Sequence, residues 1–312
     1  MKQLSIFLAL SAIIILFAYI SYNELRHRSS PQTMSDEAVA TPEFNVESGP
    51  LPAISYDLPN NVTFAGEPVP MELPDVRERL DKELQINIYL HSNTIFLIKR
   101  ANRWLPQMQE ILRAHGIPDD FKYLPLIESN LLNVVSPAEA VGYWQILKTS
   151  GQEFGLEITN EVDERYNPLK ATEAACKYLK QAYRKFGNWT LVAASYNRGM
   201  GGIERAIENQ REKSYYDLFL NEETSRYVFR IIAIKEIVEN PVRYGFKINP
   251  KHYYDEEPLE YVEVTETVKS LVDFAKHHGT NYKLIKRHNP WLRDEKLTVK
   301  KGRRYKIALP GK

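Results

Sequence analysis

The sequence has a single cysteine, Cys176, so no disulfide can form within the chain. Its neighbourhood, residues 174–179, has a helical pattern, which predicts a small buried side chain. The seven histidines lack metal-ligand spacing, and the adjacent His277 and His278 cannot share one face of a helix. A glycine-rich phosphate loop is also absent. We therefore predict no metal and no other cofactor.

An excess of charge of either sign is also missing. The 41 lysines and arginines nearly balance the 40 aspartates and glutamates, which gives a formal net charge of +1. Proteins that bind nucleic acid usually carry a clustered basic face, so we predict no nucleic-acid partner. The 312 residues are 43% hydrophobic, which is enough for a globular core and for two or three modules.

An apolar run over residues 4–22 is broken only by three serines. Its length is close to the roughly 20 residues that span a bilayer. Residues 1–25 are therefore either an uncleaved membrane anchor or a signal peptide. We favour the anchor, because the run exceeds a typical signal core and no small-x-small cleavage site follows it. Either reading predicts an exported or membrane-anchored protein, and the positive charges on both flanks of the run leave its orientation open.

The next segment, residues 26–72, contains seven prolines and many small and acidic residues. Such a composition buries little apolar surface, so we predict an extended linker. Residues 73–250 follow with helical periodicity, for example Val76, Leu80 and Leu84, which predicts a mainly α domain.

The pattern changes after Pro258. Residues 261–264 and 304–309 alternate like short strands, and two short helical stretches lie between them. This order predicts a separate βααβ module over residues 259–312.

Glu128 closes the apolar run of residues 123–127. A carboxyl group among apolar side chains is desolvated, which raises its pKa and suits it to donate a proton to a glycosidic oxygen. The alternative is an ordinary surface glutamate on a helix. Pro125, inside the same predicted helix, indicates a kink one turn earlier. Two later clusters, residues 142–145 and 195–199, mix small, aromatic and amide side chains that suit a sugar-binding cleft.

Four motifs in order carry a family resemblance. They are Glu128-Ser129, residues 136–145 (Ser-Pro-Ala-Glu-Ala-Val-Gly-Tyr-Trp-Gln), residues 194–199 (Ala-Ser-Tyr-Asn-Arg-Gly) and residues 223–228 (Glu-Thr-Ser-Arg-Tyr-Val). Residues 117–232 thereby resemble lytic transglycosylases of the soluble-lytic-transglycosylase (SLT) superfamily, and within it the membrane-bound lytic murein transglycosylase D group. The resemblance implies a lysozyme-like fold of the goose-type or SLT kind.

The same resemblance implies a function. The family cleaves the β-1,4 bond between N-acetylmuramic acid and N-acetylglucosamine in peptidoglycan without water, and leaves a 1,6-anhydromuramic end. Glu128 would act first as acid and then as base, since the C6 hydroxyl of the sugar is the nucleophile. The positions expected to bind substrate are Ser129, Ser136, Gly142, Tyr143, Gln145, Tyr196, Asn197, Glu223 and Tyr227.

Some roles stay open within this resemblance. Tyr196 is expected to donate a hydrogen bond to Glu128, and core packing is its alternative; Tyr227 could belong to the cleft or to the core. Glu139 and Arg198 stand where the family usually has glycine and alanine. Two rival functions follow: a hydrolytic muramidase with Glu139 as its second acid, and a peptidoglycan-binding protein without catalysis.

The C-terminal residues resemble a LysM peptidoglycan-binding module. Residues 289–292 (Asn-Pro-Trp-Leu) and 301–307 match its later part, whereas Thr265-Glu266-Thr267-Val268 replaces the usual Gly-Asp-Thr-Leu opening. The resemblance implies a degenerate LysM-like, glycan-binding module.

Overall fold

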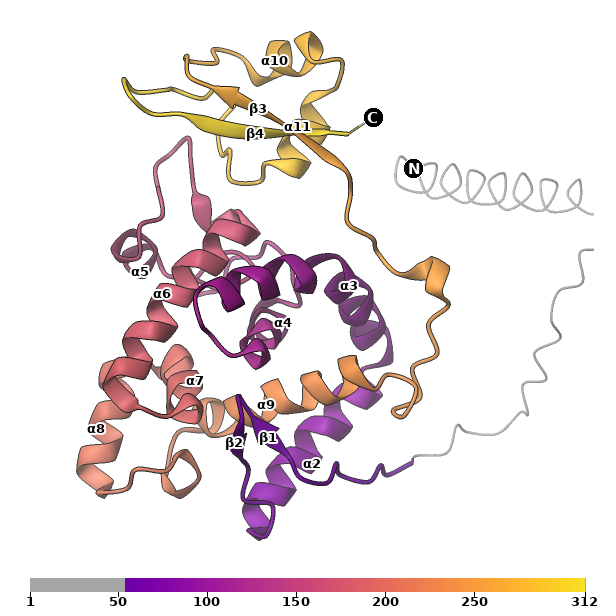
Figure 1. Cartoon of the computed structure of the whole chain (residues 1–312), viewed down its shortest axis with the longest axis vertical. Coiled ribbons are helices and arrows are strands. Elements are labelled where there is room, and N and C mark those ends of the chain that lie inside the picture. Colours follow the sequence, from indigo (N-terminus) through magenta and orange to yellow (C-terminus); the bar gives the residue numbers. More distant parts are fainter. Residues whose placement is uncertain (1–53, 312) are drawn as a thin grey trace, which may run out of the picture. The chain divides into compact units, whose positions relative to one another are not determined.

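The computed structural model describes residues 54–311 (Figure 1). The predicted anchor at residues 4–22 and the first part of the predicted linker lie outside this range. Among the helices of the described range, none combines the length and the apolar character needed to cross a bilayer.

The larger part of the described chain is a helical domain, as predicted (Figure 1). Its helices are amphipathic or fully buried, and their apolar faces form one continuous core. The helices are α2 (Pro74–Tyr89), α3 (His91–Ala114), α4 (Leu124–Ser129), α5 (Lys148–Glu153), α6 (Pro168–Phe186), α7 (Trp189–Arg198), α8 (Met200–Gln210) and α9 (Glu222–Glu239), with 3-10 turns η1 (Asp119–Tyr123), η2 (Glu164–Tyr166), η3 (Tyr215–Asp217) and η4 (Pro250–His252).

Helices α2, α7 and α4 all pack against α9, which therefore lies at the centre of the domain's contacts. Figure 1 shows α4 in the middle of the domain, with α3, α6, α7 and α9 around it. This arrangement places the short helix that carries Glu128 among the larger ones.

The predicted linker is too long at its C-terminal end. Strands β1 (Thr63–Phe64) and β2 (Glu67–Pro68) pair as a hairpin, and the Phe64 ring is fully buried against Phe121. Both carboxylate oxygens of Glu67 also accept from backbone amides at the start of α7, at 2.6 and 3.0 Å. The prolines suggested an extended chain, but the apolar residues between them join the core of the domain.

The helix predicted to carry Glu128 is divided. Residues Asp119–Tyr123 form the 3-10 turn η1, and α4 begins at Leu124 with Pro125 in its first turn. Proline is favoured there because its missing N–H has no partner in that turn. The expected kink is therefore the start of a new helix.

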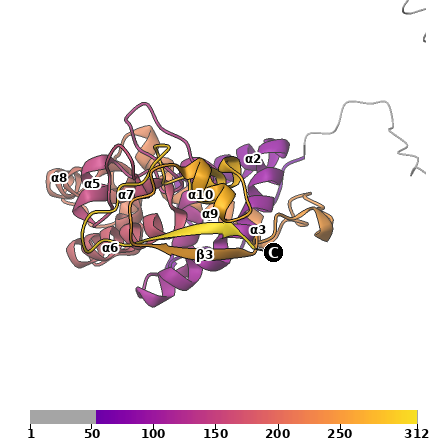
Figure 2. The same ribbon diagram turned by 90° about the horizontal axis from the view of Figure 1, so that it is seen from above.

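The βααβ prediction is confirmed. Strands β3 (Leu259–Val264) and β4 (Tyr305–Pro310) pair antiparallel, and helices α10 (Leu271–His277) and α11 (Tyr282–His288) lie between them in sequence. Figure 2 shows the two strands running side by side. This C-terminal module has its own core, in which Trp291 stacks on Tyr305.

Candidate active site

Glu128 is half-buried in the last turn of α4. The helix ends immediately afterwards, because Asn130 and Leu131 adopt left-handed conformations with φ of 53° and 55°. Asparagine tolerates this region, whereas leucine does so only under strain. Leu131 is fully buried, and that packing holds the turn in place. This turn therefore ends the helix one residue after Glu128.

The carboxyl group of Glu128 accepts a hydrogen bond from the hydroxyl of Tyr227 on α9. Burial raises the pKa of Glu128, and the negative charge of Glu223 adds to this effect. The Tyr227 hydrogen bond and the positive charge of Arg230 act in the opposite direction, but burial prevails. A glutamate with a raised pKa keeps its proton into the range where a general acid needs it.

Two cavities meet at this carboxyl group. The first has a volume of about 710 Å³ and lies among α2, α3, α4 and α9. The second has a volume of about 480 Å³ and lies among α5, α6, α7 and residues 133–146, which we call the cleft loop. Glu128 and Glu223 line both cavities. A long substrate can therefore extend to either side of Glu128.

The cleft loop brings Ser136 and Gln145 into the second cavity. The Gln145 side-chain nitrogen donates to the carbonyl of Gly142 at 2.8 Å, which leaves its oxygen available as an acceptor. The Ser136 hydroxyl accepts from the amide of Ala140 at 3.0 Å and keeps its own proton to donate. Together they offer one donor and one acceptor, which matches an amide or hydroxyl group of a sugar.

Asn197 and Glu223 join the ends of α7 and α9 beside the same cavity. The Asn197 amide donates to Glu223 at 2.8 Å, and its oxygen accepts from the Thr224 hydroxyl at 2.6 Å. The two predicted residues therefore lie together, and their contact holds the Glu223 carboxylate near Glu128.

The partner predicted for Glu128 is wrong. Tyr196 lines the second cavity, but its hydroxyl donates to the carbonyl of Trp144 at 2.7 Å. The hydrogen bond to Glu128 comes instead from Tyr227, which is fully buried and belongs to core and site at once. Tyr196 thus supports the cleft loop, and Tyr227 holds the carboxyl group.

Three other residues that were predicted to bind substrate make contacts within the protein. Tyr143 is buried edge-to-face against Trp104, with 5.3 Å between ring centres, and lines neither of the two cavities. Ser129 lines the first cavity, but its hydroxyl donates to the Tyr143 carbonyl at 2.9 Å. Gly142 lines neither cavity and packs directly on the backbone of Arg165.

Glu139 does not join Glu128. Its side chain is exposed and lines neither cavity. Its φ of 61° explains why glycine suits this position. The structure therefore does not place Glu139 as a second acid.

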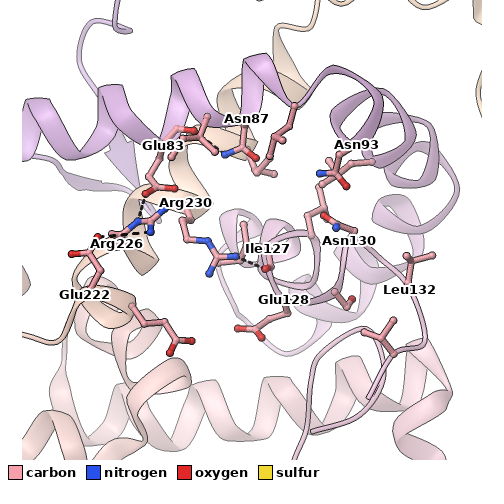
Figure 3. Close-up of a pocket in the computed structure, with 18 residues that line it drawn as sticks. Glu83, Asn87, Asn93, Ile127, Glu128, Asn130, Leu132, Glu222, Arg226 and Arg230 are labelled. Atoms are coloured by element: carbon pink, nitrogen blue, oxygen red, sulfur yellow. Dashed lines mark hydrogen bonds and ion pairs between the residues drawn. The ribbon is translucent and has the colours of Figure 1, made fainter. Parts of the chain in front are cut away.

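The wall of the first cavity was not predicted. Figure 3 shows Glu83 and Asn87 of α2 on the side of the cavity opposite Glu128. Glu83 is only 2% exposed and pairs with Arg226 of α9. A glutamate at helical spacing among Leu80, Leu84 and other apolar residues was the signal for such a buried ion pair.

Comparison with known families fits this geometry. Residues 109–219 match the transglycosylase SLT domain, and residues 260–312 match the soluble lytic transglycosylase C-terminal LysM-like domain. The chain carries an SLT domain. Glu128, the cleft loop and α7 all lie inside that match, whereas α2 and α9 lie outside it. The helical domain is thus lysozyme-like in fold, and the βααβ module is the LysM-like domain.

Curated relatives agree with the domain match. The chain is homologous to the membrane-bound lytic murein transglycosylase D of two Escherichia coli strains, K12 and O6:H1, with 30% identity over 194 residues. These residues cover 59% of this chain and 42% of each relative, so the chain spans less than half of their length. A solved structure of an inactive mutant of the lytic transglycosylase Slt from Pseudomonas aeruginosa aligns with a TM-score of 0.37 and 19% identity, over 48% of this chain and 26% of that one.

Gly142 provides a test of how the SLT domain holds its cleft loop. A Cβ atom there would lie 2.1 Å from the backbone oxygen of Arg165, and φ is +81°. Gly142→Ala is therefore expected to lower the free energy of unfolding by about 3 kcal/mol and to reduce substrate affinity. Gly187 also has positive φ, but nothing lies within 4 Å of its added Cβ, so Gly187→Ala should cost only about 1 kcal/mol. Equal losses in urea denaturation would contradict this role of the close contact.

Proposed function

We propose that this protein is a peptidoglycan lytic transglycosylase. One observation carries the proposal: a half-buried glutamate with a raised pKa, held by a tyrosine, at the junction of two cavities in an SLT domain. The substrate would be the glycan strand, bound across both cavities with its muramic acid–glucosamine bond at Glu128.

Glu128 acts twice in the proposed reaction. As the neutral acid it donates its proton to the glycosidic oxygen, the bond from that oxygen to the anomeric carbon breaks, and glucosamine leaves with a hydroxyl group. The N-acetyl carbonyl of the muramic acid supports the positive charge at the anomeric carbon. The Glu128 carboxylate then removes the proton of the C6 hydroxyl, whose oxygen bonds to the anomeric carbon. The acid is regenerated, and no water is consumed.

The positions of the polar groups support this use of a single carboxyl group. The Tyr227 hydroxyl donates to the carboxyl and can stabilise its charged form between the two steps. Ser136 and Gln145, in the second cavity, offer the donor and the acceptor that the N-acetyl group of a sugar needs to be held in place.

A hydrolytic muramidase is the second candidate, because Glu223 also lines both cavities. Glycosidases that use water place two carboxyl groups across the scissile bond. Glu223, which raises the pKa of Glu128 through its negative charge, is the residue that could activate a water molecule.

Digestion of purified peptidoglycan separates the two candidates. We expect mass spectrometry of the soluble fragments to show 1,6-anhydromuramic ends, which are one water lighter than reducing ends. Fragments that carry only reducing ends would establish the muramidase, and binding without any release of fragments would establish a peptidoglycan-binding protein without catalysis.

The proposed place of action is the cell envelope, on the periplasmic side, where peptidoglycan lies. Residues 4–22 would anchor the protein in a membrane or direct its export, and the LysM-like module would add glycan binding. The names of the homologous transglycosylases, which are membrane-bound, support this location.

A further inference from the structure

The net charge of the whole chain is close to zero, but the LysM-like module and the rest of the chain differ in charge. Residues 259–312, the LysM-like module, contain 13 lysines and arginines against six aspartates and glutamates. The other 258 residues contain 28 against 34. The basic character is thus concentrated in the C-terminal module, where a negatively charged ligand would be attracted.

The positive charges gather at one turn, residues 299–306, which we call the basic turn. Lys300, Lys301, Arg303 and Lys306 are all exposed, and among residues 54–311 no carboxylate lies within 4.0 Å of their charged groups. Gly302, with φ of +81°, allows the chain to reverse between them. Lysines and arginines so close in sequence repel one another, and a negatively charged ligand would relieve that repulsion.

The basic turn is held in a defined position beside the SLT domain. Val162 of that domain is 2% exposed and belongs to the apolar core of the module. Next to it, the amide of Asp163 donates to the carbonyl of Trp291 at 2.9 Å, and the amide of Arg293 donates to the carbonyl of Glu161 at 2.8 Å. These backbone hydrogen bonds join the LysM-like module directly to the SLT domain, so the connecting segment is not the sole link between them.

The base of the turn lies near the second cavity. The Tyr305 hydroxyl donates to the carboxylate of Glu157 at 3.0 Å. Glu157 is three residues from Phe154, which lines the second cavity, and so lies within about 11 Å of it along the chain. A polymer that extended from the second cavity past Phe154 would therefore approach the basic turn.

We propose that the basic turn binds the carboxylates of the peptide stems on the glycan strand that occupies the second cavity. The inference rests on the proposed function, because peptidoglycan carries short acidic peptides at regular intervals along its strands. Arginine and lysine side chains bind carboxylates through charge-assisted hydrogen bonds. The basic turn would then favour glycan strands that still carry their peptide stems, and the SLT domain would cleave these strands.

The test compares two variants with the same change in charge. Lys301→Glu with Arg303→Glu reverses the turn, and Lys276→Glu with Lys283→Glu reverses two exposed lysines of the same module outside the turn. Each is assayed on intact glycan strands and on strands from which an amidase has removed the peptides. We expect the turn variant to raise KM on intact strands by about fivefold to tenfold, with kcat and both constants on bare strands unchanged. The control variant should match the wild type on both substrates.

Equal effects of the two variants, or an equal effect on both substrates, would overturn the proposal. So would loss of binding to phosphatidylglycerol vesicles by the turn variant with no change in cleavage, since the turn would then serve a lipid surface. If the wild type cleaves neither substrate, the proposed function fails, and cosedimentation of the wild type and both variants with intact and bare strands still tests the turn. Weaker cosedimentation of the turn variant with intact strands alone supports the proposal.

Discussion

Glu128→Gln is expected to reduce the release of soluble fragments from peptidoglycan by about 10³-fold or more. Glutamine can neither donate the proton that the leaving oxygen needs nor accept one from the C6 hydroxyl, so both proposed steps fail. The amide still fits the half-buried site and can accept from Tyr227. The release of fragments is measured on purified variant and wild type, with circular dichroism as the control for folding.

A second property of this variant separates a catalytic role from damage to the fold. Burial raises the pKa of Glu128 in the folded protein, so the native state holds this proton more tightly than the unfolded chain. The contribution of Glu128 to stability is therefore present at low pH and lost as the pH rises through the folded-state pKa. Glutamine has no such proton, and the variant should gain stability relative to the wild type from pH 5 to pH 8. An inactive variant that is less stable at pH 8 would point to misfolding instead.

Tyr227→Phe is expected to lower kcat by about 10-fold to 100-fold, since it removes a hydrogen bond to a group that becomes charged. That hydrogen bond also lowers the pKa of Glu128, against the effect of burial. Its loss should therefore raise the pKa further. Because the acid form of Glu128 begins the reaction, the alkaline limb of the activity profile should move to higher pH.

Tyr196→Phe is the matched control, because the Tyr196 hydroxyl donates to the Trp144 carbonyl. It should leave the alkaline limb in place and affect mainly KM, through the cleft loop. A shift of the limb in the Tyr196 variant alone would show that the partner predicted from sequence is the right one.

The contrast between these two tyrosines shows what the sequence could and could not reveal. Glu128 was singled out by the apolar run before it and by the four motifs that carry the family resemblance, and each of these is a local pattern. Its partner lies 99 residues away on another helix, and only the packing of α4 on α9 selects Tyr227 over Tyr196. Local patterns likewise predicted the βααβ module, whose strands alternate with period two.

The missed features also depend on distant contacts. Tyr143 lies in a motif of cleft residues, but its ring turns inward to Trp104 of α3. Glu83 occupies a position that the apolar spacing of α2 marks as buried, but its partner Arg226 lies 143 residues away and no local pattern identifies it. The hairpin at residues 63–68 is too short to give a periodic signal, and its burial depends on Phe121 and the start of α7.

The most direct test of the single-carboxyl mechanism is the digestion of peptidoglycan in water enriched in oxygen-18. If the C6 hydroxyl of the sugar is the nucleophile, no atom from the solvent enters the product, and mass spectrometry will show anhydro ends without the heavy isotope. If Glu223 or another group activates water, each new reducing end will carry one oxygen-18 atom. The first result is the one that we predict, and the second would contradict the account.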